Sequence, residues 1–155
     1  MAFPPSPHMA RALALAADAA RGGEVPVGAV IVAIDGQVIA EAANATRRLN
    51  DPTAHAELLA IRLAAARVGA DRLIGASLHV TLEPCAMCAG AIGWARIARL
   101  YYGAADPKGG AVAHGPCLFA QPTTHHAPEI YGGIGETEAA AMLRGFFAQR
   151  REFAA

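Results

Sequence analysis

Thr81-Leu-Glu-Pro-Cys-Ala-Met-Cys88 is the stretch around which the rest of the chain is interpreted, because it sets two cysteines at C-x-x-C spacing directly after a proline. Upstream, His55-Ala-Glu57 adds an imidazole and a carboxylate. Pro84 suits the first turn of a helix, so Cys85 and Cys88 are expected on one side of it. Two thiolates and one imidazole make three zinc ligands, whereas a structural zinc site has four. The sequence therefore predicts a catalytic zinc site with one position left to water.

His55 and Glu57 lie two residues apart, so in the middle of a helix their side chains would point to nearly opposite faces. Both can approach one metal ion only if the ion lies beyond the N-terminal end of that helix. Thr53 is a suitable N-cap and would place both residues near this end. Cysteines that are merely buried small residues are the alternative. The combination of H-x-E with P-C-x-x-C favours metal binding.

The composition is that of one globular domain over residues 1–155. Hydrophobic residues make up 54% of the chain and charged residues 17%, and thirteen basic side chains balance thirteen acidic ones. No overall field attracts nucleic acid, so any RNA-binding surface must be local. Three cysteines, two of them at metal-ligand spacing, favour a reducing compartment. Charged residues interrupt the apolar run at residues 10–20, so no membrane span is expected and the predicted location is cytoplasmic.

The order of the elements predicts an α/β fold, a three-layer α/β/α sandwich in which a five-stranded mixed sheet carries helices on both faces. Strands are expected at residues 27–34, 37–43, 77–82, 98–103 and 128–131. Helices are expected at residues 8–21, 53–68, 84–95 and 136–151. Residues 1–7 contain three prolines and are expected to form a loose arm, and residues 104–124 a long loop with functional content.

Apolar spacing also predicts which face of each helix points inward. In the first helix these residues are Met9, Leu13, Ala16 and Ala20. In the second they are Leu58, Ile61, Ala65 and Val68. In the last they are Ala139, Met142, Leu143 and Phe146, while the adjacent Phe147 faces elsewhere and is free to stack on a base or a partner subunit.

The predicted site implies hydrolysis. Zinc lowers the pKa of a bound water from 15.7 to about 7. Glu57 is close enough to handle the protons of that water without being a ligand. The expected reaction removes an amino group from a nucleobase: hydroxide adds to the ring carbon that bears the amine, and Glu57 protonates a ring nitrogen and then assists the departure of ammonia.

The pattern H-x-E…P-C-x-x-C resembles that of the zinc nucleoside and nucleobase deaminases. Further stretches are similar to the branch of bacterial tRNA-specific adenosine deaminases, and the likeness extends from about Arg21 to Arg151. These stretches are Glu24-Val-Pro-Val-Gly-Ala-Val30, Asp51-Pro-Thr-Ala-His-Ala-Glu57, residues 78–90, Gly103-Ala-Ala-Asp-Pro-Lys-Gly-Gly110 and the Phe146-Phe147…Arg150-Arg151 ending.

The resemblance implies a cytidine-deaminase-like fold, one Zn²⁺ per subunit and conversion of the wobble adenosine of a tRNA anticodon stem-loop to inosine, usually by a homodimer. It implies zinc ligation by His55, Cys85 and Cys88, and acid–base catalysis by Glu57. By the same matching, Asn44 would contact the flipped nucleotide, the backbone of Ala56 would hold the base, and Val30 would pack on its ring. The remaining substrate-binding residues implied are Pro84 and, in a loop that grips flanking nucleotides, Asp106 and Lys108.

Two segments depart from this pattern. Gly93-Trp94-Ala95-Arg96 is closer to the free guanine deaminases, and His125-His126-Ala127 stands where the family has Asn-His-Arg. A free guanine or cytosine-type deaminase is therefore one alternative, and a non-enzymatic, zinc-stabilised RNA-binding module is another. RNA contacts by His125, His126, Arg47, Arg48, Arg150 and Arg151 stay open. Cys117 has no partner at ligand spacing and is expected to be structural or incidental.

Overall fold

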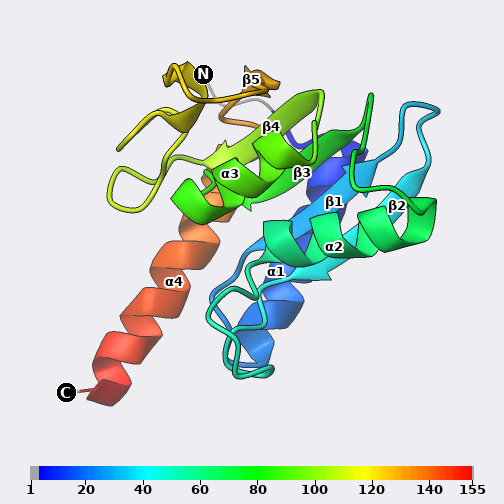
Figure 1. Cartoon of the computed structure of the whole chain (residues 1–155). Helices are drawn as coiled ribbons and strands as arrows, with labels where there is room; N and C mark the ends of the chain where they lie inside the picture. The colour runs from blue at the N-terminus through cyan, green and yellow to red at the C-terminus, as the bar shows by residue number, and fades with distance from the viewer. Residues whose placement is uncertain (1–3, 155) are drawn as a thin grey trace.

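Five strands form one mixed sheet in the computed structural model, which describes residues 4–154 (Figure 1). They are β1 (Gly28–Val32), β2 (Val38–Ala43), β3 (Ser77–Leu82), β4 (Arg99–Ala104) and β5 (Glu129–Tyr131), in the order β2-β1-β3-β4-β5. β1 is antiparallel to β2 and β3, whereas β3, β4 and β5 run parallel. The parallel strands β3 and β4 therefore end at the same edge of the sheet.

Helices cover both faces of the sheet, which confirms the predicted three-layer sandwich (Figure 1). α1 (Pro7–Arg21) and α4 (Glu136–Ala154) lie on one face, and α2 (Ala56–Val68) and α3 (Ala86–Trp94) on the other. Side chains of a strand alternate between faces, so Val30 and Val32 pack with α1 and α4 while Ile31 packs with α2 and α3. A short 3₁₀ helix, η1 (Leu118–Ala120), lies in the long loop. None of the helices within residues 4–154 is long and apolar enough to cross a membrane.

α1 begins earlier than the sequence predicts. Ser6 is its N-cap, with a hydroxyl that accepts a hydrogen bond from the N–H of Met9 at 3.2 Å, and Pro7 is the first helical residue. Proline suits this position because the N–H that it lacks would have no partner inside the helix. The predicted loose arm over residues 1–7 is therefore wrong at its C-terminal end. Residues 1–3 lie outside the described residues.

α2 differs from its prediction in both its start and its inner face. It begins at Ala56, three residues after Thr53, and the side chains that face the sheet are Ala56, Ala60 and Ala64. Within the predicted stripe, Val68 is 47% exposed, and Ile61 is only partly buried. A row of methyl groups lets the helix approach the sheet closely, so the alanines pack inward and the larger side chains lie at the margin.

The predicted inner faces of the other two long helices are mostly confirmed. The fully or nearly fully buried side chains are Met9, Ala12, Leu13, Ala16 and Ala19 in α1, and Ala139 and Phe146 in α4. In α1, Ala19 is buried where the periodicity predicted Ala20. In α4, Met142 and Leu143 are partly buried against the same core.

Gly28 explains how closely α1 lies on the sheet. A Cβ atom at this position would fall 2.0 Å from the carbonyl oxygen of Ala12 and 2.9 Å from the backbone nitrogen of Ala16. Both are backbone atoms, so they cannot rotate away as a side chain could. The start of β1 therefore requires glycine for contact with α1.

Candidate metal centre and active site

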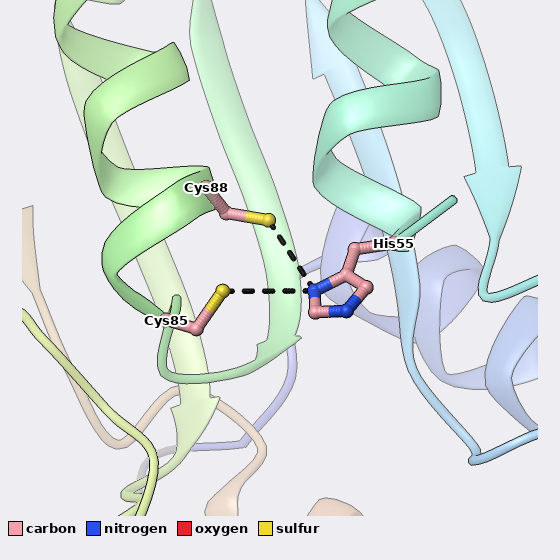
Figure 2. Close-up of side chains that lie close together, drawn as sticks. All are labelled: His55, Cys85 and Cys88. Carbon is pink, nitrogen blue, oxygen red and sulfur yellow. Dashed lines mark hydrogen bonds between the residues drawn. The ribbon is translucent and has the colours of Figure 1, made fainter. Parts of the chain in front are cut away.

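The predicted metal donors lie at the starts of two neighbouring helices (Figure 2). His55 is the N-cap of α2 and Cys85 the N-cap of α3; both have extended backbones, and neither side chain caps its helix. Cys88 lies one turn into α3 and is fully buried. The predicted N-cap at Thr53 is wrong, because the N–H and hydroxyl of Thr53 both donate to the Asp51 carboxylate at 2.8 and 2.7 Å.

The spacing of the three donor atoms suits one zinc ion. Nδ1 of His55 lies 3.6 Å from Sγ of Cys85 and 3.6 Å from Sγ of Cys88 (Figure 2), and all three atoms lie within 4.8 Å of one another. A tetrahedral ion with bonds of about 2.3 Å to sulfur and about 2.0–2.1 Å to nitrogen would hold these atoms about 3.6 Å apart. The residues therefore fit zinc. In the part of the chain that is described, no fourth His, Cys, Asp or Glu joins the cluster.

Mutual hydrogen bonding dominates the ionisation of the two thiols. The hydrogen bond with Cys88 lowers the pKa of Cys85 to about 5, against the effect of burial and with help from the nearby His55 ring. The same hydrogen bond, together with burial, raises the pKa of Cys88. The arrangement thus favours the thiolate form of Cys85 and the thiol form of Cys88. Contact with a divalent cation favours the thiolate of both, since this is the form that binds metal.

Glu57 places a carboxyl group beside the donors. It lies in the first turn of α2, is 4% exposed, and is close enough to Cys88 for the two side chains to affect each other's pKa. Burial raises the pKa of Glu57 to about 7; the negative charge of Cys85 acts in the same direction and His55 opposes it. A carboxyl group with a pKa near 7 can both accept and donate a proton at neutral pH.

Three predicted substrate-binding residues lie next to the donors in the fold. Ala56 is the first residue of α2, Pro84 directly precedes the first cysteine, and both are fully buried. Asn44 follows β2 and is largely buried. The N–H of the next residue, Ala45, donates to the carbonyl of Ala54 at 3.0 Å, which brings Asn44 to the segment that leads into α2.

Val30 is not brought to the site. It is fully buried on the α1 side of the sheet, in the same cluster as Met9 and Leu13. This placement contradicts the predicted contact between Val30 and a substrate ring. Val25, from the same motif, lines an open groove instead. The motif contains three valines, and its pattern alone does not say which of them reaches solvent.

A groove of about 910 Å³ opens between the loop after β4 and the C-terminal half of α4. The Asp106 carboxylate folds this loop, since it accepts hydrogen bonds from the N–H groups of Lys108 at 3.2 Å and Gly109 at 2.9 Å. Three cationic side chains, Lys108, Arg150 and Arg151, border this groove, together with the exposed ring of Phe147. The lining includes Val25, Leu82, Asp106, Lys108, Phe147, Arg150 and Arg151.

Two buried glutamates, neither of them predicted as a site residue, bind the loops on either side of the metal donors. Glu24 accepts the N–H groups of Arg47 and Arg48 at 3.1 and 2.9 Å. Glu83 accepts four backbone N–H groups from residues 106–114. A glutamate inside an otherwise apolar stretch was the available signal, because a buried carboxylate needs partners.

Comparison with known proteins agrees with this geometry. The family model described as "Cytidine and deoxycytidylate deaminase zinc-binding region" matches residues 5–104. The chain belongs to this zinc deaminase family. A tRNA-specific adenosine deaminase of Agrobacterium fabrum is 58% identical over 143 residues, which cover 92% of this chain and 93% of that protein.

Two solved structures are similar to this zinc deaminase over most of its length. One comes from work on A-to-I editing by tRNA:A34 deaminases at the wobble position of transfer RNA; it is 58% identical, with a TM-score of 0.86, over 88% of this chain and 98% of that one. The other, a guanine deaminase from Bacillus subtilis, is 38% identical, with a TM-score of 0.63, over 80% of this chain and 82% of that one. The predicted family, fold and zinc cofactor are confirmed.

The segments in which this deaminase departs from the tRNA-editing pattern contact each other. Trp94 is 67% exposed, and its ring lies 5.2 Å from the ring of His125; both line a pocket of about 250 Å³ beside α3. Nε2 of His126 hydrogen-bonds to the carbonyl of Ile97 at 2.7 Å, so this ring packs within the chain. Cys117 lies outside the metal cluster, with its thiol 3.7 Å from a backbone carbonyl.

Proposed function

We propose that this enzyme converts adenosine to inosine at the wobble position of a tRNA anticodon loop by zinc-dependent hydrolysis. The observation that carries the proposal is the 58% identity across 93% of a tRNA-specific adenosine deaminase. The chemistry is supported by three metal donors at zinc spacing and by Glu57, whose pKa of about 7 suits proton transfer in both directions.

His55, Cys85 and Cys88 would hold one zinc ion per subunit. When bound, zinc supplies a water molecule whose pKa is lowered to about 7. Glu57 would accept a proton from the attacking water and pass it to N1 of the adenine ring as the water oxygen bonds to C6. Glu57 would then transfer the proton of the new C6 hydroxyl to the amino group, so that C6 becomes a carbonyl, the C6–N bond breaks, and ammonia leaves. Water and adenosine thus give inosine and ammonia.

Residues on both sides of the metal donors would hold the substrate. The Asn44 side chain contacts the flipped nucleotide, the backbone N–H of Ala56 holds the base, and Pro84 lies beside it. Asp106 and Lys108 grip the neighbouring nucleotides. The target base must leave its stack to reach the site, and an anticodon loop that is already unstacked lowers this cost.

The groove beside α4 would take the rest of the RNA loop. Because the whole chain has no net charge, attraction to phosphate must come from a local surface, and Lys108, Arg150 and Arg151 border this groove. Phe147 is exposed there, and an aromatic ring offers a stacking surface for a base. Arg47 and Arg48 lie exposed on the loop at the other side of the site.

The proposal extends to a homodimer of single deaminase domains, each spanning residues 1–155, in the cytoplasm where tRNA is found. α3 exposes two large apolar side chains, Met87 and Trp94, which suit contact with a second copy. Sedimentation or light scattering of the purified protein tests the dimer directly.

Deamination of a free base is the second candidate. It is favoured by the exposed Trp94 in a segment that departs from the tRNA-editing pattern, and by the 38% identity to a guanine deaminase. A non-enzymatic RNA-binding module is disfavoured, because a structural zinc site has four protein ligands and only three donors cluster within the described residues.

One assay separates these functions. Purified protein is incubated with an anticodon stem-loop RNA, free adenosine, guanine and cytidine, and ammonia is measured. Release of ammonia from the stem-loop far above that from the small substrates is the expected result. Preference for guanine or cytidine would instead assign a free-base or free-nucleoside deaminase, and no release from any substrate would favour the binding module.

A further inference from the structure

The Glu83 carboxylate is the centre of a buried hydrogen-bond cluster that the proposed reaction does not use. Oε1 accepts the backbone N–H of Asp106 at 3.0 Å, and Oε2 accepts the N–H groups of residues 112, 113 and 114 at 3.2, 3.0 and 3.2 Å. Nδ1 of His114 lies a further 2.7 Å from Oε1. The Glu83 side chain has no exposed surface. One carboxylate therefore gathers a loop that lies 23–31 residues away in the sequence.

The loop closes tightly on this carboxylate. A Cβ atom on Gly110 would lie 2.5 Å from Oε2 of Glu83 and 2.5 Å from the carbonyl oxygen of Asp106. The N–H of Ala111 donates to the carbonyl of Pro84 at 2.9 Å, which is a second link between the loop and the end of β3. The segment that carries Asp106 is thus joined to the two residues that precede the first metal ligand.

We propose that Glu83 is a positioning residue: it fixes Asp106 and Lys108 relative to Cys85, so that the flanking nucleotides and the target base are bound in one geometry. This inference rests on the proposed function, because it assigns the loop at 106–108 to RNA. Both oxygens of Glu83 are occupied by the loop, so it acts through other residues. A carboxylate is required since four backbone N–H groups converge on it, and a glutamine would present an NH₂ donor to some of them.

The test compares Glu83→Gln and Gly110→Ala with wild type, each loaded with zinc. Glu83→Gln keeps the volume but loses an acceptor, and Gly110→Ala pushes the loop away from an intact carboxylate. Glu129→Gln is the matched control, since its carboxylate lies on β5 and contacts Arg99 of β4, away from the loop. The measurements are zinc per chain, melting temperature, and Kd, KM and kcat for an anticodon stem-loop RNA.

Both test variants should raise Kd and KM at least about tenfold and change kcat less than about threefold, because they weaken hydrogen bonds that orient binding residues rather than the acid–base group. Zinc should stay at one ion per chain, and Glu129→Gln should behave like wild type. A lower melting temperature with unchanged Kd would overturn the proposal and leave Glu83 a purely structural role.

If Glu83→Gln does not fold or loses zinc, Gly110→Ala decides by the same criteria. Two unfolded variants would make this cluster a folding requirement and reject the positioning role. A wild-type protein that binds and deaminates no stem-loop RNA would refute the proposed function itself, and the positioning role with it. If wild type is fully active and both variants keep its Kd and KM for the stem-loop RNA, only the role of Glu83 is refuted.

Discussion

His79 should make the folded protein sensitive to acid. Its ring is 6% exposed and stacks on Tyr101, with 4.6 Å between ring centroids, and it lies 5.0 Å from the ring of His8. Nε2 lies 3.2 Å from the hydroxyl of Ser77, whereas Nδ1 is buried with no hydrogen-bond partner among the described residues. Burial, with a smaller contribution from His8, lowers the pKa of His79 from 6.5 to about 4.

The sign of the effect follows from the two pKa values. The unfolded chain takes up a proton at His79 as the pH falls through 6.5, while the folded chain does so only near pH 4. The stability contribution is therefore fully present above pH 6.5 and is lost as the pH falls toward 4. Its full size is about 3 kcal/mol, or about 2 kcal/mol once partial hydration of the ring is allowed for.

His79→Phe tests this prediction because the new ring can still stack on Tyr101 but cannot be protonated. Urea unfolding followed by circular dichroism gives the free energy of unfolding at about pH 7.5 and about pH 5. Wild type should lose about 1–2 kcal/mol more than the variant over this interval. His125→Phe, at an exposed histidine, is the control and should lose as much as wild type. An equal loss in wild type and His79→Phe would refute the reasoning.

Four further substitutions test the site and the packing. Glu57→Ala should keep the fold and the zinc but lower kcat by at least about 10²-fold, because it removes the acid–base group; appreciable residual deamination would reject this role. Cys85→Ser and His55→Ala should instead lose zinc, as measured by elemental analysis, and a full zinc content would reject the ligand assignment. Gly28→Ala should destabilise the fold by about 1–3 kcal/mol or more in urea unfolding, since its Cβ would lie 2.0 Å from a backbone oxygen. Gly145→Ala, where a Cβ meets nothing within 4 Å, is the matched control, and comparable losses in both would contradict the packing argument.

The metal donors could be predicted from the sequence because the C-x-x-C and H-x-E motifs place their side chains only a few residues apart. Cys85 and Cys88 are three residues apart at the start of α3, so they share one side of that helix. His55 and Glu57 are two residues apart and can reach one site only at the N-terminal end of α2. The order of helices and strands along the chain, and the helices on both faces of the sheet, also followed from apolar patterns. These features depend on neighbours along the chain, which a sequence displays directly.

The errors arise where the outcome depends on distant contacts. α2 presents Ala60 and Ala64 to the sheet rather than its larger apolar residues, because close approach to the sheet decides which face turns inward. Val30 follows a motif match but lies on the wrong side of β1 for substrate contact. The apolar surroundings of Glu83 indicate that it needs partners, but the sequence does not identify them, since they lie 23–31 residues further along.

The alanines that line the helix–sheet contacts on both faces set an unusual pattern of mutational tolerance. Alanine loses no rotamer entropy on folding, but it also removes little apolar area from water. The helices must then be held on the sheet by close van der Waals contact, such as that between Gly28 and α1. Substitution of a larger residue at these helix–sheet contacts, rather than of a smaller one, should therefore be the commonest way in which a single change destabilises the fold.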